Sequence, residues 1–496
     1  MTQVALGTEL FSPALPKSDS SAVPLFVDLD GSLIATDTLV ESALLMVKQS
    51  PTALLKLPLW LLQGKAVLKR RIAEHVTLNA AALPYRAEVL EHINREREAG
   101  REVVLATAAD RSIADAVADH LGVFDRVLAS DGQTNLSSSN KLKAIQASCD
   151  GAFDYVGNSH DDVKLWAAAG GSFAVAPSGS VLRSMKAVCQ PRQVFHADGN
   201  SRANQLRAVA KALRPHQWVK NVLLAVPLVA SHQVTNLHGL MAVGVSFAAF
   251  SAAASSVYLT NDLLDLEADR LHPTKRNRPF AAGTLPLIAG VIMTPMLLGI
   301  ALLIASLLSL KMVGMIAAYV AISSTYSLYL KRKLLVDVFA LAGLYTFRIL
   351  TGAIAIGVVL TPWLLAFSMF LFISLAFAKR FTELRMVRLG SGKAAKGRGY
   401  IVDDLEIFTS VGPGSGYMAV LVMCLYINSD AVLKLYKHPE LLWLACPALL
   451  YWITRLWFLA QRGELPDDPV RFAIHDKASY AVAAVVALVV LAASVI

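Results

Sequence analysis

The sequence predicts a multidomain protein: an α/β domain of Rossmann-like type, followed by an all-α membrane domain of nine transmembrane helices. Three observations support this. Of the 496 residues, 55% are hydrophobic and only 17% are charged. The mean hydropathy is +0.51. The apolar residues are unevenly distributed, because residues 1–215 carry ordinary charge whereas 216–496 consist mostly of long apolar runs separated by short charged loops.

The first domain shows strands that end in polar residues. An apolar segment at 23–27 runs into Asp28 and Asp30, a second at 102–106 runs into Thr107, and a third at 153–157 is followed by several acids. The carboxyl ends of parallel strands meet at one edge of a sheet, where α/β proteins form their sites. Thr107 alone would be an ordinary strand end, but several such ends in order predict a site.

Residues 51–72 of this domain are apolar and then basic. The segment is too short to span a bilayer, which leaves two interpretations open. It forms the core of a helical cap over about 37–100, or it is a surface that touches the membrane.

In the second half, nine apolar segments have the 17–25 residues that a bilayer requires. They lie at 217–236, 238–260, 285–308, 312–330, 335–357, 362–380, 413–430, 440–460 and 477–496. If the first domain is cytoplasmic, the loops on its side carry seventeen Lys and Arg and the opposite loops three. This bias predicts a multi-pass protein of a bacterial inner membrane, with the first domain and all motifs on the cytoplasmic side.

The domain boundaries follow from the same composition. We expect a disordered N-terminus at 1–21, the α/β domain at 22–189, a linker at 190–206 and the membrane domain at 207–496. The net charge of +9 does not indicate a nucleic-acid partner, because the bases lie beside apolar spans.

A string of acids follows the second apolar segment. Asp262, Asp265 and Asp269 are spaced three and four apart, so on a continuous helix their carboxylates share one face. Asn261 precedes them, and the nearby bases are Lys275, Arg276 and Arg278. Acids amid bases at a membrane boundary indicate Mg²⁺ holding a phosphorylated ligand, although a solvated loop beside the membrane is the simpler alternative.

Further polar residues lie at the cytoplasmic ends of the spans or within them. A cation inside a span needs a partner or a ligand, and Arg348 lies in the middle of the fifth span. The other candidates for substrate binding are Lys220, Asn221, Lys331, Lys379 and Arg380. For the bases 331–333, a role in setting topology is the stronger interpretation.

The motifs NDLLDLEADR and HPTKRNRPFAAG resemble those of the UbiA-type intramembrane prenyltransferase superfamily over roughly 207–496. LRPHQWVKN, YSLYLKR and LPDDPVRFAIHD are most similar to its decaprenyl-phosphate phosphoribosyltransferase branch. That resemblance implies Mg²⁺-dependent transfer of 5-phosphoribose from phosphoribosyl pyrophosphate to a polyprenyl phosphate, for cell-wall arabinan. Asp262 and Asp265 would be catalytic, and Asn261 and Asp269 would help to hold the metal.

Residues 22–185 resemble the haloacid dehalogenase-like phosphatases. The resemblance implies that Asp28 is the nucleophile and Asp30 the general acid and base, while Thr107 and Lys141 bind the phosphoryl group. Mg²⁺ would be held by Asp28, Asp30, Asn158 and Asp162. Asn158 stands where the family usually has Asp, which leaves two alternatives: an active phosphatase or a degenerate regulatory domain.

Together these features predict a bifunctional enzyme that builds a lipid-linked 5-phosphoribose and then removes its 5-phosphate. One alternative is an aromatic polyprenyltransferase with a regulatory first domain. Its second acidic motif would be replaced here by Lys379 and Arg380, with Asp403 and Asp404 as a displaced remnant. Another is a lipid-phosphate binding or transport protein. The oligomeric state is left open, including a homo-oligomer.

Overall fold

The computed structural model describes residues 23–149, 151–196, 202–390, 399–466 and 468–495. The predicted disordered N-terminus and part of the predicted linker lie outside these residues. The chain divides into two compact units. The first comprises residues 1–209 together with 262–289, and the second comprises 210–261 and 290–496.

The first unit is built on the predicted parallel sheet. Its six strands lie in the order β3-β2-β1-β4-β5-β6. They are β1 (Leu25–Val27), β2 (Val103–Asp110), β3 (Arg126–Ser130), β4 (Asp154–Gly157), β5 (Gly171–Val175) and β6 (Gln193–Phe195). All neighbouring strands are parallel, and β1, at the centre, is completely buried.

Helices cover both faces of this sheet. Leu25 and Val27 face one apolar core and Phe26 faces the other, as the alternation of a β-strand requires. The covering helices are α4 (Ala87–Glu98), α5 (Arg111–Leu121), α6 (Ser139–Ser148), α7 (Val163–Ala168) and α8 (Gly179–Lys186). The predicted strands ending at Asp28, Thr107 and Asn158 therefore lie side by side in one sheet.

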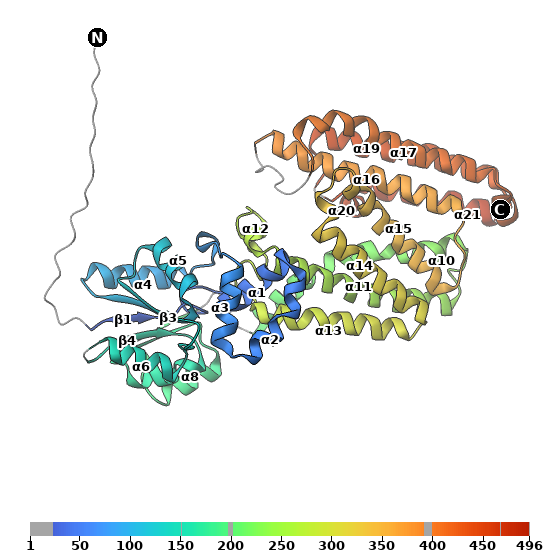
Figure 1. The fold of residues 1–496 in the computed structure, drawn as a ribbon. Helices are drawn as coiled ribbons and strands as arrows, with labels where there is room; N and C mark the ends of the chain where they lie inside the picture. The colour runs from blue at the N-terminus through green and yellow to red at the C-terminus, as the bar shows by residue number, and fades with distance from the viewer. Residues whose placement is uncertain (1–22, 150, 197–201, 391–398, 467, 496) are drawn as a thin grey trace, which may run out of the picture. The chain divides into compact units, whose positions relative to one another are not determined.

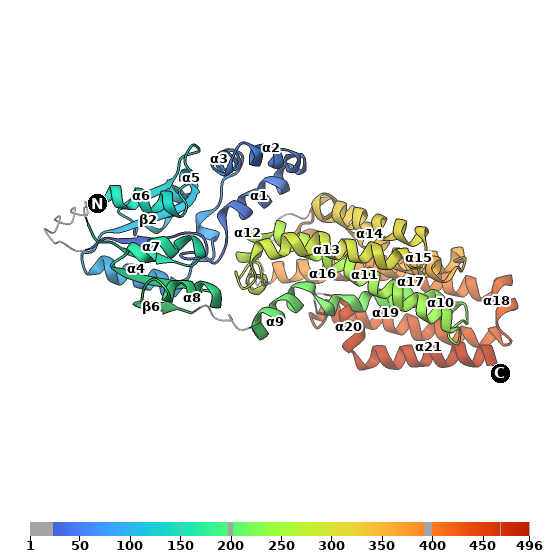
Figure 2. The ribbon, with the colours of Figure 1, turned by 90° about the horizontal axis from the view of Figure 1, so that it is seen from below.

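A helical cap is inserted between β1 and β2. It consists of α1 (Thr38–Gln49), η1 (Pro51–Leu55), α2 (Leu57–Leu62) and α3 (Lys65–His75), where η denotes a 3-10 helix. Figure 2 shows α1, α2 and α3 grouped together beside the sheet. After the cap come η2 (Ala80–Ala82) and α4, whose Val89 and Ile93 pack in the core of the sheet.

The segment 262–289 also belongs to the first unit. It contains α12 (Leu266–Arg270) and η5 (Lys275–Asn277). Arg270 makes a bidentate ion pair with Glu41 of α1, at 2.5 and 3.0 Å, and both side chains are less than a tenth exposed. A buried pair of this kind fixes the segment against the cap.

The second unit is helical, and the described residues include eight helices of the chain that are long and apolar enough to cross a membrane. The nine predicted helices are therefore not all present as long spans. The long helices are α11 (Leu237–Leu264), α13 (Leu287–Ser306), α14 (Leu310–Leu328), α15 (Val336–Ile356), α16 (Pro362–Arg388), α17 (Leu405–Ile427), α19 (Ala445–Arg462) and α21 (Lys477–Val495). Figure 1 shows most of them running roughly side by side. Shorter elements connect them: α9 (Arg202–Leu213), which begins in the first unit, η6 (Leu330–Arg332), η7 (Val402–Asp404), α18 (Asp430–Leu435), η8 (Pro439–Leu444) and α20 (Pro469–His475).

The first predicted span, 217–236, is the one that differs. It forms η4 (Pro215–Ala225) and the short α10 (Val226–Ala230) instead of one long helix. A Cβ on Gly352 of α15 would come within 2.1 Å of the Leu224 carbonyl oxygen, so η4 lies directly against the backbone of that helix. At the rises of 3-10 and α helices, η4 and α10 together extend about 30 Å, roughly the thickness of the hydrocarbon core. Irregular backbone at this depth is tolerated where it packs against protein, as η4 does against α15.

Candidate functional sites

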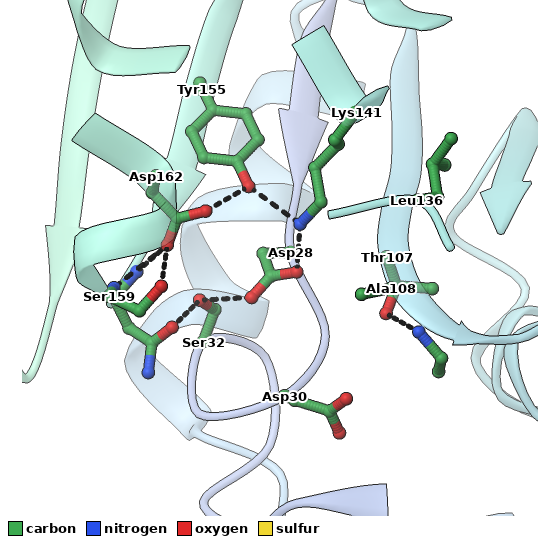
Figure 3. A network of polar contacts seen from close by, with 12 residues as sticks. Asp28, Asp30, Ser32, Thr107, Ala108, Leu136, Lys141, Tyr155, Ser159 and Asp162 are labelled. Carbon is green, nitrogen blue, oxygen red and sulfur yellow. Dashed lines mark hydrogen bonds and ion pairs between the residues drawn. The ribbon is translucent and has the colours of Figure 1, made fainter. Parts of the chain in front are cut away.

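The first candidate site lies at the carboxyl end of β1 (Figure 3). Lys141, from α6, places its Nζ 2.6 Å from Asp28 Oδ1 and 3.1 Å from the Tyr155 hydroxyl. Both members of the ion pair are buried, at 7% and 4% exposure. Burial raises the pKa of Asp28, and Lys141 opposes this shift. Burial disfavours the charged form of Lys141, but Asp28 and Asp162 outweigh it and raise the lysine pKa.

The other oxygen of Asp28 lies beside the Ser32 hydroxyl, which also contacts the Asn158 amide oxygen. The Ser32 hydroxyl lies 3.2 Å from Asp28 Oδ2 and 3.3 Å from Asn158 Oδ1, so it stands between the carboxylate oxygen and the amide oxygen. Gly31, at φ +76°, makes room, because a Cβ there would come within 2.1 Å of Asn158. Carboxylate and amide oxygens are the ligands that Mg²⁺ prefers, and this donor set fits the ion.

Asp162, a predicted metal ligand, accepts four hydrogen bonds. Its Oδ1 accepts from the Tyr155 hydroxyl at 2.7 Å, and its Oδ2 accepts from the Ser159 hydroxyl and from the backbone N–H groups of Asn158 and Ser159, at 2.9 to 3.0 Å. These bonds fix the loop that carries Asn158, and the role of Asp162 as a metal ligand stays a prediction. Asp161 beside it is exposed.

Asp30 points away from the Asp28–Lys141 pair in Figure 3. Its carboxylate accepts from the backbone N–H of Thr38 at 2.8 Å and from the Thr38 hydroxyl at 3.2 Å, at the start of cap helix α1. Burial, followed by the charge of Asp37, raises the pKa of Asp30 to about 7. A carboxyl group with this pKa suits proton transfer near neutral pH.

Thr107, a predicted residue, is fully buried, and its hydroxyl accepts from the Ala109 N–H at 3.0 Å.

Two further residues, Lys69 and Tyr155, line this region and were not predicted. The Nζ of Lys69, from α3, donates to the Ala108 carbonyl at 2.6 Å and to Asn135 at 2.7 Å. Burial lowers its pKa, opposed by Asp30 and Asp37. No motif distinguishes Lys69 from the other bases of the cap, whereas Tyr155, also missed, stands inside a predicted strand.

The second candidate site is the acid string, and here the expectation of one helical face is wrong. Helix α11 ends at Leu264 and α12 begins at Leu266, with Asp265 as the residue between them, at φ −106° and ψ 19°. The break turns Asp265 toward Lys48 of the cap, whose Nζ lies 3.0 Å from Asp265 Oδ1.

Asp262 and Asp269 do converge. Nη1 of Arg278 lies 3.1 Å from Asp262 Oδ1 and 2.6 Å from Asp269 Oδ2, and both acids are at most 3% exposed. The positively charged guanidinium of Arg278 thus lies between two carboxylates. A divalent cation could be bound by the same carboxylate oxygens. Among the residues that the structure describes, no group of three His, Cys, Asp or Glu is arranged to hold a metal.

The remaining predicted members of this string are placed as follows. Lys275 and Arg276 lie in η5 and are exposed. Asn261 lies in α11 and is the last residue of the first of the two segments that make up the second unit.

The second unit contains its own charged cluster. Lys220 of η4 places its Nζ 2.6 Å from Asp468 Oδ2 and 5.8 Å from the centre of the Tyr345 ring. Asp468 also caps α20, since its Oδ1 accepts from the N–H groups of Val470 and Arg471. Lys379 interacts electrostatically with both Lys220 and Asp468. Lys379 therefore lies within electrostatic range of the Lys220–Asp468 pair, and Glu383 and Arg380 also act on it. Asp468 lies in the LPDDPVRFAIHD motif, whose spacing alone predicts no role for it.

Arg348 is held inside the bundle. Its Nε donates to Asn221 Oδ1 at 3.1 Å, and its Nη1 donates to the Leu344 carbonyl at 2.6 Å. The aromatic rings of Phe250, Tyr319 and Tyr345 surround the guanidinium at 5.3 to 5.6 Å. These contacts satisfy the cation within the protein, and they join η4, α11, α14 and α15.

Arg380 is also balanced by protein groups. Its Nε lies 2.6 Å from Asp337 Oδ2, its Nη1 lies 2.7 Å from Glu383, and its Nη2 donates to Tyr326. With two carboxylates on a side chain that is 1% exposed, Arg380 ties α15 to α16. Lys331 lies in η6, partly buried. Asp404 accepts the N–H of Ile401 and so caps η7 locally.

Comparison with known proteins identifies the family. A sequence model of the UbiA prenyltransferase family matches residues 222–475, about half of the chain. The chain belongs to the UbiA prenyltransferase family. An uncharacterized protein of Sinorhizobium fredii, y4nM, is 36% identical to this UbiA-family chain over 94% of its length and 90% of the relative. The predicted membership in the UbiA superfamily is thus confirmed.

Two further likenesses concern the separate parts of the UbiA-family chain. Decaprenyl-phosphate phosphoribosyltransferase of Mycobacterium tuberculosis is 37% identical over 212 residues, which cover 42% of the chain and 68% of the relative. A solved structure of phosphoserine phosphatase, as a phospho-aspartyl intermediate analogue, resembles 39% of the chain and 99% of that protein, at 15% identity and a TM-score of 0.26.

Proposed function

We propose that the chain is a bifunctional membrane enzyme. Its UbiA domain transfers 5-phosphoribose from phosphoribosyl pyrophosphate to a polyprenyl phosphate, and its first domain removes the 5-phosphate to give a polyprenylphosphoryl ribose. The observation that carries the transferase half is the 37% identity to decaprenyl-phosphate phosphoribosyltransferase. The Lys220–Asp468–Lys379 cluster supports it, because lysines held among apolar helices suit an anionic lipid headgroup.

In the transfer, an oxygen of the lipid phosphate attacks C1 of the ribose while the bond from C1 to the pyrophosphate oxygen breaks. The lipid phosphate is already an anion, so the step needs no strong base. Lys220 and Lys379 hold the lipid phosphate or the donor's 5-phosphate. Lys275, Arg276 and Arg278 stabilise the charge that grows on the leaving pyrophosphate. Arg348 and Arg380, which are engaged by protein groups, position the helices around the site.

Asp262 and Asp269 would hold Mg²⁺ on the pyrophosphate, with Asn261 assisting, while Asp265 keeps its contact with Lys48 of the cap. For this, Arg278 must exchange its contact with the acids for one with the donor phosphates. A bound Mg²⁺ would supply charge neutralisation at the leaving group.

In the phosphatase reaction, Asp28 attacks the phosphorus of the ribose 5-phosphate and forms an aspartyl-phosphate, while the bond from phosphorus to O5 breaks. Asp30 gives its proton to O5. Water then attacks the phosphorus and gives a proton to the Asp30 carboxylate, while the bond from phosphorus to the Asp28 oxygen breaks and inorganic phosphate leaves. Lys141 neutralises the Asp28 carboxylate and holds the phosphoryl group, and Asp28, Asn158 and the Asp30 carbonyl would hold Mg²⁺.

The test is transfer of label by the purified full-length protein. Phosphoribosyl pyrophosphate labelled in the ribose is incubated with decaprenyl phosphate and MgCl₂, and the lipid fraction is counted. We expect labelled lipid that forms only with both substrates. An unlabelled lipid fraction, together with activity toward polyprenyl pyrophosphate and a hydroxybenzoate, would instead establish an aromatic prenyltransferase.

We further propose that the protein lies in a bacterial inner membrane with both sites on the cytoplasmic face. The excess of Lys and Arg in the loops on one side supports this orientation. The cell-wall arabinan pathway is the expected destination of the product.

A further inference from the structure

The helical cap presents an apolar surface that its own core does not require. Helix α2 and the preceding η1 contain five leucines that are more than half exposed, from 52% to 85%: Leu54, Leu55, Leu59, Leu61 and Leu62. In contrast, Ala53, Leu57 and Trp60 face inward and pack with Met46, Ile72 and Val76. The cap core is therefore complete without the five outward leucines. Of the two interpretations that the sequence left open for this segment, the structure favours a contact surface for its outward face.

The charges around this face have one sign. Between Glu41 and Glu74 the sequence contains no acidic residue, and it contains six bases. Lys56 directly precedes α2, Lys65 begins α3, and both are exposed. An apolar helical face flanked by Lys and Arg, without acids, is typical of a segment that lies in the interface of a bilayer containing anionic lipids.

The length of the segment agrees with this placement. Residues 51–62 form a short apolar helical segment, well below the roughly 20 residues of a transmembrane helix. The segment can lie in the membrane plane but cannot cross it. The described part of the same chain contains eight helices long and apolar enough to span a membrane. A bilayer surface is therefore available to the cap.

We infer that η1 and α2 dock the phosphatase cap onto the membrane surface, with the five leucines inserted among the lipids and Lys56 and Lys65 at the anionic headgroups. This inference rests partly on the proposed function, since docking would hold the Asp28 site within reach of a phosphate carried by a lipid. The docking itself is inferred from the exposed leucines and the flanking bases alone. Only its benefit to catalysis depends on the proposed function.

The docking is tested with the full-length protein in nanodiscs of phosphatidylcholine and phosphatidylglycerol, after replacement of the native cysteines. A bimane fluorophore is attached to Leu62→Cys and, as the matched control, to Val188→Cys. Val188 is 45% exposed on the same unit, after α8 and outside the cap. We expect doxyl-labelled lipid to quench the probe at position 62 and iodide in the water to leave it bright, with the opposite result at position 188.

Quenching of the probe at position 62 by iodide, or protection from both quenchers, would overturn the inference. The first result would mean a solvated face, and the second would mean that protein covers it, such as a second copy of the chain. Neither readout depends on catalysis, so this experiment stays decisive if the proposed function fails.

A second measurement tests the consequence. In the double variant Leu59→Glu and Leu62→Glu, both substitutions are at exposed positions, so the fold should persist. We expect hydrolysis of the lipid-linked phosphate to fall about tenfold, because docking raises the local concentration of that substrate. Hydrolysis of soluble p-nitrophenyl phosphate should be unchanged. Equal rates on the lipid-linked substrate, or equal losses on both substrates, would contradict the role of the face.

Discussion

Two carboxylate sites in the first unit hold their positive charges in different ways. At the end of β1, Lys141 contacts one oxygen of Asp28, while the other oxygen faces Ser32 and, through it, Asn158. In the acid string, a single nitrogen of Arg278 contacts both Asp262 and Asp269. In the first site the neutral Ser32 hydroxyl stands between the carboxylate and the amide oxygen, whereas in the second the protein's own cation stands between two carboxylates.

The difference shows how far each site is already arranged to bind Mg²⁺ and a phosphorylated substrate. The proposed phosphatase site is pre-formed, because its loop is fixed by Asp162 and its proposed nucleophile, Asp28, by Lys141. In the proposed transfer, the acid string would have to exchange a cation before it could hold Mg²⁺ with a pyrophosphate. The phosphates of the arriving donor would attract Arg278 and so favour that exchange.

The largest effect is expected for Asp28→Asn. The amide cannot attack phosphorus, so hydrolysis of a soluble phosphomonoester should fall at least about 1,000-fold. Transfer of phosphoribose should keep its rate, because the acid string is untouched. Loss of both activities together would mean that the two sites do not work separately.

A somewhat smaller effect is expected in the acid string. Asp262→Asn or Asp269→Asn should reduce phosphoribosyl transfer about 100- to 1,000-fold, since each removes charge from the pair that would hold the metal. Asp265→Asn is the matched control, because its carboxylate contacts Lys48, and it should lose less. A greater loss for Asp265→Asn than for the other two would show that the pairing with Arg278 does not mark the metal site. Label in the lipid fraction measures all three.

Asn158→Asp should strengthen Mg²⁺ binding at the first site, in contrast to the preceding substitutions, which weaken activity. The substitution adds a negative charge next to Asp28 and turns a neutral ligand into an anionic one. We expect the Mg²⁺ concentration for half-maximal phosphatase activity to fall about tenfold, which corresponds to about 1.4 kcal/mol of binding. An unchanged Mg²⁺ dependence would place Asn158 outside the metal shell.

The smallest effect concerns pH. Burial and the charge of Asp37 raise the pKa of Asp30 to about 7, so this acid stays protonated, and able to donate, below that pH. Phosphatase activity should therefore fall as the pH rises through about 7. Asp37→Asn should move this fall to lower pH, because it removes one raising charge. An amide at position 37 can still accept the Val40 N–H that caps α1. A pH profile on the soluble ester measures the shift, and an unmoved limb would assign it to another group.

Much of this architecture could be predicted because its signals are local in the sequence. Apolar runs ending in Asp28, Thr107 and Asn158 gave the strands of the sheet, and eight of the predicted spans have a long helix. The break at Asp265 and the irregular η4 could not be predicted, because they depend on contacts made in the fold. Lys48 draws Asp265 away from its neighbours, and the close approach of Gly352 accommodates the backbone of η4.

The candidate sites show the same limit. Motif spacing found Asp28 and Lys141, which lie together as expected. Spacing could not show that Asp162 is occupied by Tyr155 and Ser159, or that Arg380 is balanced by Asp337 and Glu383. A residue's type and position suggest its chemistry, but its partners decide whether that chemistry is available.

The most direct test of the two-step account is the mass of the lipid product made from phosphoribosyl pyrophosphate and decaprenyl phosphate. Wild-type protein should give decaprenylphosphoryl ribose, Asp28→Asn should give the same lipid with one additional phosphate, and Asp262→Asn should give neither. A wild-type product that retains the 5-phosphate, or a full yield of ribosylated lipid from Asp262→Asn, would contradict the account.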